Sequence, residues 1–226
     1  MSYNPLSSLI TITLGGAVGV AYAAYEVRRT GQPASHELTA RVYKLAKSMG
    51  GIPDSLEVRE GRAATAKGFT TSLPLFSPIV FLEKEADDWT IAHELSHIKK
   101  YHGEKLHGLG IAGAFAIHAL FKKCSVKLGV AGIALFPIVG LAYNRHLEME
   151  ADLHAMKYVD TPALKTAIQF FYRHLHAADE DESLSGLLSK LQISTIGSTH
   201  PPVEARIAVL QRELARRNKP LTHQKA

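Results

Sequence analysis

Near the middle of the chain lies the sequence His93-Glu94-Leu95-Ser96-His97. On a helix, residues i and i+4 lie on one face, so the imidazoles of His93 and His97 can reach a single metal ion. Glu94 is rotated from His93 by about a third of a turn, where its carboxylate can reach a metal-bound water rather than the metal. The same pattern also arises by chance in amphipathic helices with exposed histidines. A third metal ligand elsewhere in the chain would favour the metal site.

The identity of that third ligand separates two classes of site. A metzincin needs a glycine at position 100 and a histidine at 103, whereas this chain has Lys100 and Gly103. A glutamate from a second helix is the alternative, as in His₂Glu zinc sites, and Glu148 can supply it. Asp152 follows one turn later and can accept the free N–H of a ligating histidine. The competing interpretation is a charged, solvated helix, and we assign Glu150 to such a face.

These residues predict one zinc ion per chain, bound by His93, His97 and Glu148. Zinc lowers the pKa of a bound water to about 7, which makes hydroxide available near neutral pH. Glu94 would act as the general base, taking the proton from that water and passing it to the leaving amine. The predicted reaction is therefore the hydrolysis of a peptide bond.

Three motifs follow one another along the chain. They are His93-Glu94-x-x-His97, Glu148-x-x-Ala151-Asp152 preceded by Arg145, and His200-Pro201-Pro202 followed by Arg206. In this order they resemble the membrane metallopeptidase family of HtpX and the CAAX prenyl proteases, over roughly residues 59–210. The resemblance implies a zinc-dependent endopeptidase that acts on membrane or misfolded proteins, with a hydrophobic hairpin between its two metal-binding helices.

The resemblance also implies that His200 and Arg206 lie near the catalytic cleft. His200 would bind the oxyanion of the transition state or gate the metal, so His200 and Arg206 join Glu94 as expected catalytic residues. Taken alone, His200 could simply be a residue at a helix entrance, and Arg206 could form a surface ion pair. Both alternatives stay open at the level of sequence.

One segment departs from the family pattern. The family carries an Asn-Ala-Phe-Ala-like edge strand to which substrate adds as a β-strand. The corresponding residues 63–69 of this chain lack the asparagine, so the sequence does not fix the substrate preference. We expect His102, His107 and Cys124 not to bind metal. His102 follows His97 by five residues and should point to another side of the helix.

Composition restricts the other classes of function. The chain has 226 residues, of which 46% are hydrophobic, and this suits one globular domain with membrane-facing segments. A single cysteine excludes an intramolecular disulfide framework. The net charge is +5, but the basic residues are scattered and not interleaved with aromatic residues, so no nucleic-acid partner is expected. The expected partners are a protein or peptide substrate and a lipid bilayer.

The N-terminal residues 1–29 are predicted to form a membrane anchor. Residues 6–25 carry no charge, and about twenty apolar residues are what a helix needs to cross a bilayer. A cleaved signal peptide is the alternative, but no Lys or Arg precedes the run. Arg28-Arg29 follow it, and the positive-inside rule then places the catalytic domain in the cytoplasm. We expect an integral protein of a bacterial inner or plasma membrane.

Two apolar stretches, residues 106–121 and 128–143, form a predicted hydrophobic hairpin. Each would be about 24 Å long as a helix, slightly short for a full crossing. Three lysines lie between the two stretches, and a full crossing would place them on the outer side, against the charge rule. A hairpin that crosses the membrane and one that lies on it or on the domain are both consistent with the sequence.

The expected fold class is α+β, a mostly helical zincin-like domain (residues 30–220) with a small sheet and a polar tail (221–226). The third ligand lies on a separate helix over residues 144–158, and the helix of the first motif should run from Asp88 to His102, where Gly103 stops it. A non-hydrolytic membrane scaffold or chaperone that keeps zinc, or a latent peptidase closed by His200, are the alternative functions. The other expected elements are helices over residues 35–48, 161–178 and 203–217, and strands over 56–58, 63–71 and 78–82.

Overall fold

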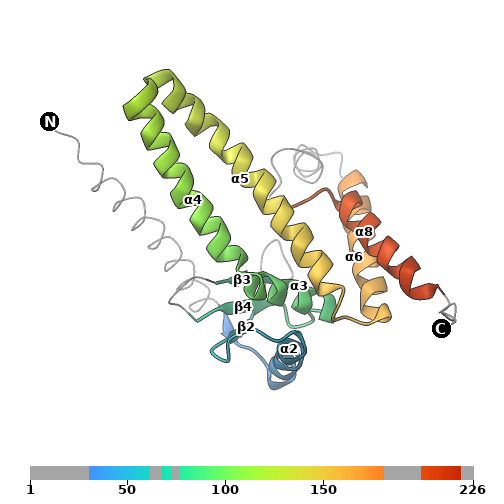
Figure 1. Cartoon of the computed structure of the whole chain (residues 1–226). Coiled ribbons are helices and arrows are strands. Elements are labelled where there is room, and N and C mark those ends of the chain that lie inside the picture. Colours follow the sequence, from blue (N-terminus) through green and yellow to red (C-terminus); the bar gives the residue numbers. More distant parts are fainter. Residues whose placement is uncertain (1–30, 62–67, 73–76, 181–199, 220–226) are drawn as a thin grey trace, which may run out of the picture.

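A computed structural model of the chain describes residues 31–61, 68–72, 77–180 and 200–219. The predicted anchor (residues 1–29), the first part of the predicted strand 63–71 and the polar tail (221–226) lie outside the described residues. The remaining chain is mostly helical with a small mixed sheet, which confirms the α+β class (Figure 1).

The sheet of the described residues has the strand order β1-β2-β4-β3. β4 lies between β2, to which it is parallel, and β3, to which it is antiparallel, so that β3 forms one edge. β1 pairs antiparallel with β2 at the other edge. The bounds are Gln32–Pro33 for β1, Glu57–Glu60 for β2, Gly68–Thr71 for β3 and Ile79–Leu82 for β4.

Side-chain alternation along β4 divides its residues between two apolar clusters. Val80 and Leu82 pack in one core with α2 (His36–Met49) and with the helix of the first motif, α3 (Asp88–Lys99). Ile79 and Phe81 face the other side, where Phe81 stacks on Phe69 of β3 at a ring distance of 4.9 Å. β4 is therefore buried on both faces and fixes α3 against the sheet.

The helix α3 begins as predicted and ends earlier than predicted. The side chain of Asp87 caps its start by accepting a hydrogen bond of 2.8 Å from the backbone N–H of Thr90. The helix stops at Lys99 because Tyr101 has a left-handed backbone (φ 55°). His102 opens the next helix, α4 (His102–Ala119), and Gly103 lies inside it rather than acting as the stop. A Cβ atom at Gly103 would collide with the carbonyl oxygen of Ser72, so α4 starts close to the end of β3.

The predicted hydrophobic hairpin is present and projects away from the sheet (Figure 1). Its arms are α4 and α5 (Val126–Ala155), joined by a π-helical turn, η1 (Leu120–Cys124). The expected break after residue 143 is wrong, since α5 continues for 30 residues without one. No glycine or proline occurs between residues 141 and 155 to end it. The helix that forms one arm of the hairpin therefore also carries Glu148.

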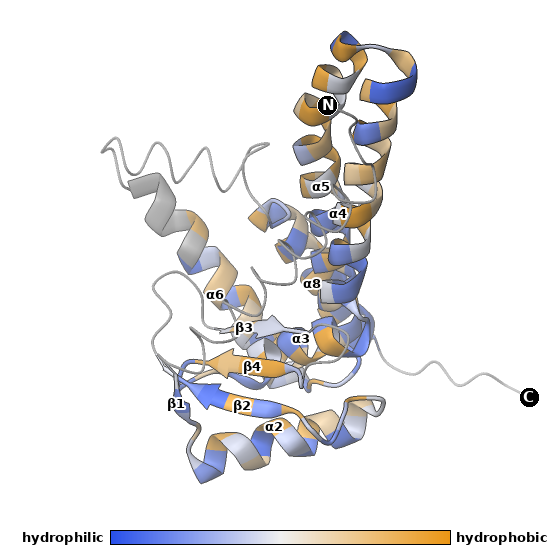
Figure 2. Ribbon diagram, turned by 90° about the vertical axis from the view of Figure 1, so that its left-hand side faces the viewer, coloured by the Kyte–Doolittle hydropathy of each residue, from blue (hydrophilic) through white to orange (hydrophobic). Residues whose placement is uncertain are grey.

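The hairpin is rich in hydrophobic residues (Figure 2), and many of its large apolar side chains are exposed. The helix α5 is the one helix among the described residues that is long and apolar enough to cross a membrane, judged by length and composition. The arms touch closely, because Gly113 lies against the ring of Phe136 and Gly129 against the ring of Phe121. The exposed large apolar residues of the hairpin are Phe115, Phe121, Val126, Leu128, Val130, Ile133, Leu135, Ile138 and Val139.

Two C-terminal helices, α6 (Thr161–Glu180) and α8 (Val203–Asn218), lie side by side next to the end of α5 (Figure 1). They form a second core with Trp89 and Ala92 of α3 and with Ala155 of α5. This core holds α8 close to the site that α3 and α5 form.

Candidate metal centre

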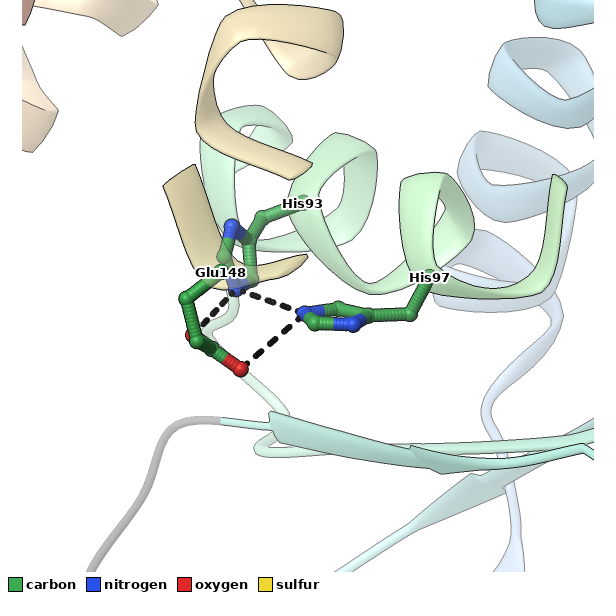
Figure 3. A group of neighbouring side chains, drawn as sticks. All are labelled: His93, His97 and Glu148. Carbon is green, nitrogen blue, oxygen red and sulfur yellow. Dashed lines mark hydrogen bonds and ion pairs between the residues drawn. The ribbon is translucent and has the colours of Figure 1, made fainter. Parts of the chain in front are cut away.

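Three side chains from two helices bring their donor atoms together (Figure 3). The Nε2 atoms of His93 and His97 lie 3.2 Å apart. The carboxylate oxygens of Glu148 lie 3.4 Å from each of these nitrogens, Oε2 beside His93 and Oε1 beside His97. The sequence placed these three residues at one site, and the packing of α3 against α5 brings them there.

These distances suit a zinc ion. With zinc–ligand bonds of about 2.0–2.1 Å, two ligand atoms of a tetrahedral site lie about 3.3 Å apart. The two Nε2 atoms are 3.2 Å apart, close to this value, and each lies 3.4 Å from a different oxygen of the Glu148 carboxylate. The side chains of His93 and Glu148 are almost fully buried, so water competes little for their donor atoms. The two imidazoles and one carboxylate therefore fit zinc in both spacing and chemistry.

A buried ion pair fixes the other nitrogen of His93. His93 Nδ1 lies 2.9 Å from Asp152 Oδ1, as the i+4 spacing from Glu148 predicts. Arg206 of α8 donates two hydrogen bonds to Asp152, of 2.7 Å from Nε and 2.6 Å from a terminal nitrogen. Arg206 is only 8% exposed, and its guanidinium lies over the ring of Phe171. The ion pair of Arg206 with Asp152 is thus buried, and the alternative of a surface ion pair, which the sequence had allowed, does not apply.

His200 lies at the open side of the site. Its Nδ1 is 2.8 Å from Glu148 Oε2, while 56% of its side chain remains exposed. The structure therefore brings His200 to the same carboxylate that faces His93 and His97. Arg206, by contrast, reaches the site through Asp152.

Glu94 follows His93 on α3 and lies beside the edge strand β3. A Cβ atom at Gly68 of β3 would lie 3.2 Å from Glu94 Cγ, so the side chain passes directly beside this strand. Glu94 is 8% exposed, and burial raises the pKa of its carboxyl to about 7 although the nearby His93 counteracts this. A carboxyl with a pKa near 7 can both accept and release a proton at neutral pH.

Two residues of the site were missed by the sequence reasoning. His102, expected to point elsewhere, places its Nδ1 2.9 Å from His97 Nδ1, and its Nε2 lies 3.3 Å from Glu150 Oε2. The prediction assumed that α3 continued to His102, and the break at Tyr101 turns His102 back toward His97. Glu150, assigned to a solvated face, belongs to this contact. His107 and Cys124 are not in the group of potential ligands among the described residues.

Comparison with known protein families matches residues 83–214 to peptidase family M48. The match covers more than half of the chain. The chain belongs to peptidase family M48. This confirms the resemblance to HtpX and the CAAX prenyl proteases.

The crystal structure of S. mikatae Ste24p has a similar fold, with a TM-score of 0.56 and 17% sequence identity. The alignment covers 89% of this chain and 56% of the Ste24p chain. This chain therefore spans little more than half of the length of Ste24p. A comparison with curated proteins gave no significant match.

The two imidazoles of the M48 site differ in basicity when no metal is bound. Burial alone would lower the pKa of His93, but the close carboxylates of Asp152 and Glu148 raise it to about 10. Burial and the neighbouring His93 lower the pKa of His97 to about 3. Burial also opposes ionisation of Glu148, yet its contacts with His200 and His93 hold the pKa of this carboxyl well below its usual range. A metal ion would therefore replace a proton that His93 carries.

Replacing Arg206 by methionine should strongly destabilise the protein. The change leaves the Asp152 charge buried without its partner, and breaking a buried pair in this way costs about 3–5 kcal/mol. Thermal or denaturant unfolding of the purified protein measures the loss. Arg216→Met is the matched control on the same helix, because Arg216 pairs with Glu213 at the surface, and it should shift the midpoint little. Equal midpoints for the two variants would contradict a supporting role of Arg206.

The raised pKa of Glu94 predicts a pH-dependent stability of the metal-free protein. The folded state binds a proton at Glu94 up to a pH of about 7, whereas the unfolded state loses it near 4.5, so stability falls between these values as pH rises. Glu94→Gln cannot ionise and should avoid this loss. Its advantage over wild type should be near zero below pH 4.5 and reach at most about 3 kcal/mol above pH 7.

Unfolding in the presence of a chelator at pH 4.5, 6 and 8 measures this difference. Glu85→Gln, at an exposed position just before α3, is the control and should follow the wild-type curve. Parallel curves for wild type and Glu94→Gln would show that Glu94 is not buried in this way.

Proposed function

We propose that the chain is a membrane-associated zinc-dependent endopeptidase that hydrolyses peptide bonds in membrane or misfolded proteins. The observation that carries the proposal is the convergence of the donor atoms of His93, His97 and Glu148 at one point, with Glu94 beside them. Membership of peptidase family M48 supports the reaction class. When bound, zinc supplies a Lewis acid and lowers the pKa of a coordinated water.

Glu94 acts as the general base and then as the general acid. Its carboxyl, with a pKa of about 7, takes a proton from the attacking water and delivers it to the amine that leaves. Asp152, held by Arg206, keeps His93 oriented with Nε2 toward Glu148 and His97. Arg206 is thus a positioning residue, one step further from the reaction than the sequence had placed it.

The edge strand β3 is the natural place for the substrate. An extended peptide can add to the free edge of a sheet through main-chain hydrogen bonds. β3 pairs with β4 on one side only within the described residues, and Glu94 passes directly beside it. A peptide bound along β3 would therefore run past Glu94 and the three ligands.

His200 has two proposed roles that are compatible with its position. It is exposed and lies at the open side of Glu148, where an imidazole N–H can bind the oxyanion that forms during peptide hydrolysis. The same contact of 2.8 Å also favours a second candidate function, a latent peptidase in which His200 closes the site.

The hairpin supports the membrane part of the proposal. Many large apolar side chains are exposed along α5, with one on the turn and one on α4, whereas soluble surfaces expose such residues singly. The fold shared with Ste24p agrees with this. From the sequence we further propose that residues 1–29 anchor the chain in a bacterial inner or plasma membrane and that the catalytic domain faces the cytoplasm.

Replacing Glu94 by glutamine should abolish cleavage and leave zinc bound. Glutamine keeps the volume of the side chain but cannot take a proton, so hydrolysis of an unfolded protein such as casein should fall by at least about 100-fold. Zinc content, measured by metal analysis, should remain near one per chain. A chelator should stop wild-type cleavage, and added zinc should restore it.

Glu85→Gln is the matched control and should cleave like wild type. Undiminished cleavage by Glu94→Gln would refute the proposed mechanism. Zinc binding without cleavage by wild type, together with cleavage by His200→Ala, would instead identify the latent form.

The hairpin should insert into lipid. A polarity-sensitive fluorophore on a cysteine at Leu135, in a Cys124→Ser background, should be quenched by spin-labelled lipids after reconstitution into vesicles, because Leu135 is 59% exposed on the apolar arm. The same label at Lys44, an exposed residue of α2, serves as the control and should be quenched by aqueous iodide. Iodide quenching at Leu135 without lipid quenching would exclude insertion of this arm.

A further inference from the structure

The second ring nitrogen of His97 faces another imidazole instead of a carboxylate. Its Nδ1 lies 2.9 Å from Nδ1 of His102, and the two rings meet edge to face. His102 is only 1% exposed, so water does not supply an alternative partner. His93, by comparison, has the carboxylate of Asp152 at the equivalent nitrogen.

The contact continues from His102 to a carboxylate. His102 Nε2 lies 3.3 Å from Glu150 Oε2, and this carboxylate also lies 3.4 Å from the amines of Lys100 and Lys105. The contacts therefore run from His97 through His102 to Glu150. It is placed to accept a hydrogen bond from His102 and has two positive charges to keep it ionised.

The geometry allows one arrangement of protons when His97 binds a metal through Nε2. Its Nδ1 must then carry the hydrogen, since a neutral imidazole has one N–H. His102 Nδ1 must accept that hydrogen, so the His102 proton lies on Nε2 and is donated to Glu150. With the His102 hydrogen on Nδ1 instead, two hydrogens would face each other across 2.9 Å. The reversed assignment, in which His102 Nδ1 donates to His97 Nδ1, puts the His97 hydrogen on Nε2, where it blocks the metal, and leaves the His102 Nε2 lone pair facing the Glu150 carboxylate.

We propose that His102, oriented by Glu150, is a positioning residue that holds His97 in the tautomer whose Nε2 is free to bind the metal. The inference rests on the proposed zinc site and deepens it. Partners of this kind commonly tune a metal site, and their loss lowers metal affinity by about 10- to 100-fold.

The backbone conformation between His97 and His102 brings these two imidazoles into contact. In an unbroken helix, residues five apart are rotated by about 140° and cannot face each other. The left-handed conformation of Tyr101, unfavourable for a residue other than glycine, ends α3 and starts α4 so that His102 turns toward His97. Strained residues of this kind persist where the surrounding structure holds them, often at functional sites. The close approach of Gly103 to Ser72 is one such restraint.

Zinc affinity of His102 variants tests the inference. His102→Leu removes the acceptor and keeps an apolar volume, and competition with a chelating dye should show an affinity about 10- to 100-fold lower than wild type. His102→Asn places its Oδ1 near the lost Nδ1 and should recover most of that loss. A residue needed only for packing would not show this recovery, because the buried amide would fit worse than leucine. His107→Leu, five residues along the same helix, is the control and should bind zinc like wild type.

Glu150→Leu provides an independent variant at a partly exposed position, in case His102→Leu does not fold. It should also weaken zinc binding, because His102 then lacks the acceptor that fixes its tautomer. The inference would be overturned if both His102→Leu and Glu150→Leu bound zinc like wild type. It would also be overturned if the leucine and asparagine variants of His102 lost affinity equally. Neither result would affect the proposed function. Failure of the wild-type protein to bind zinc would overturn the proposed function as well.

Discussion

The packing of α3 against α5 sets the register of the whole site. His93 and His97 are one turn apart on α3, and Glu148 and Asp152 are one turn apart on α5, so a single alignment of the helices serves both pairs. Ser96 and His154 help to fix that alignment. The Ser96 hydroxyl donates to the carbonyl of Ala92 and lies 3.1 Å from His154 Nδ1, with both side chains buried. A slip of either helix by one residue would separate all of these partners.

Burial of so many ionisable groups requires that their charges balance. Without a metal, the negative charges of Glu148 and Asp152 are opposed by Arg206 and by the proton on His93. Glu94 avoids a further buried charge because its pKa is raised. The site is therefore close to neutral without a cation, and the proposed zinc ion would replace the proton of His93. This balance explains how the cluster can be stable in the interior.

The sequence predicted the parts of this site that depend on helical periodicity. The i, i+4 spacings gave the pairing of His93 with His97 and of Glu148 with Asp152, and the caps and apolar patterns gave most helix starts. It did not predict the break at Tyr101, because tyrosine is not a residue that favours a left-handed backbone. His102 and Glu150 were missed for that reason. The sequence also suggested a break near residue 143, where polarity changes, but a change of polarity does not end a helix when no breaking residue is present.

In the proposed membrane peptidase, the continuity of α5 would connect the lipid bilayer to the metal site. The apolar arm and the segment around Glu148 belong to one unbroken helix, and Pro137 is the point at which a helix of this kind bends most easily. A bilayer of different thickness changes the tilt of an apolar helix. Such a tilt would move the Glu148 carboxylate relative to the imidazoles on α3, which stay fixed to the sheet. The thickness of the membrane would then influence the geometry of the metal site, in addition to anchoring the protein.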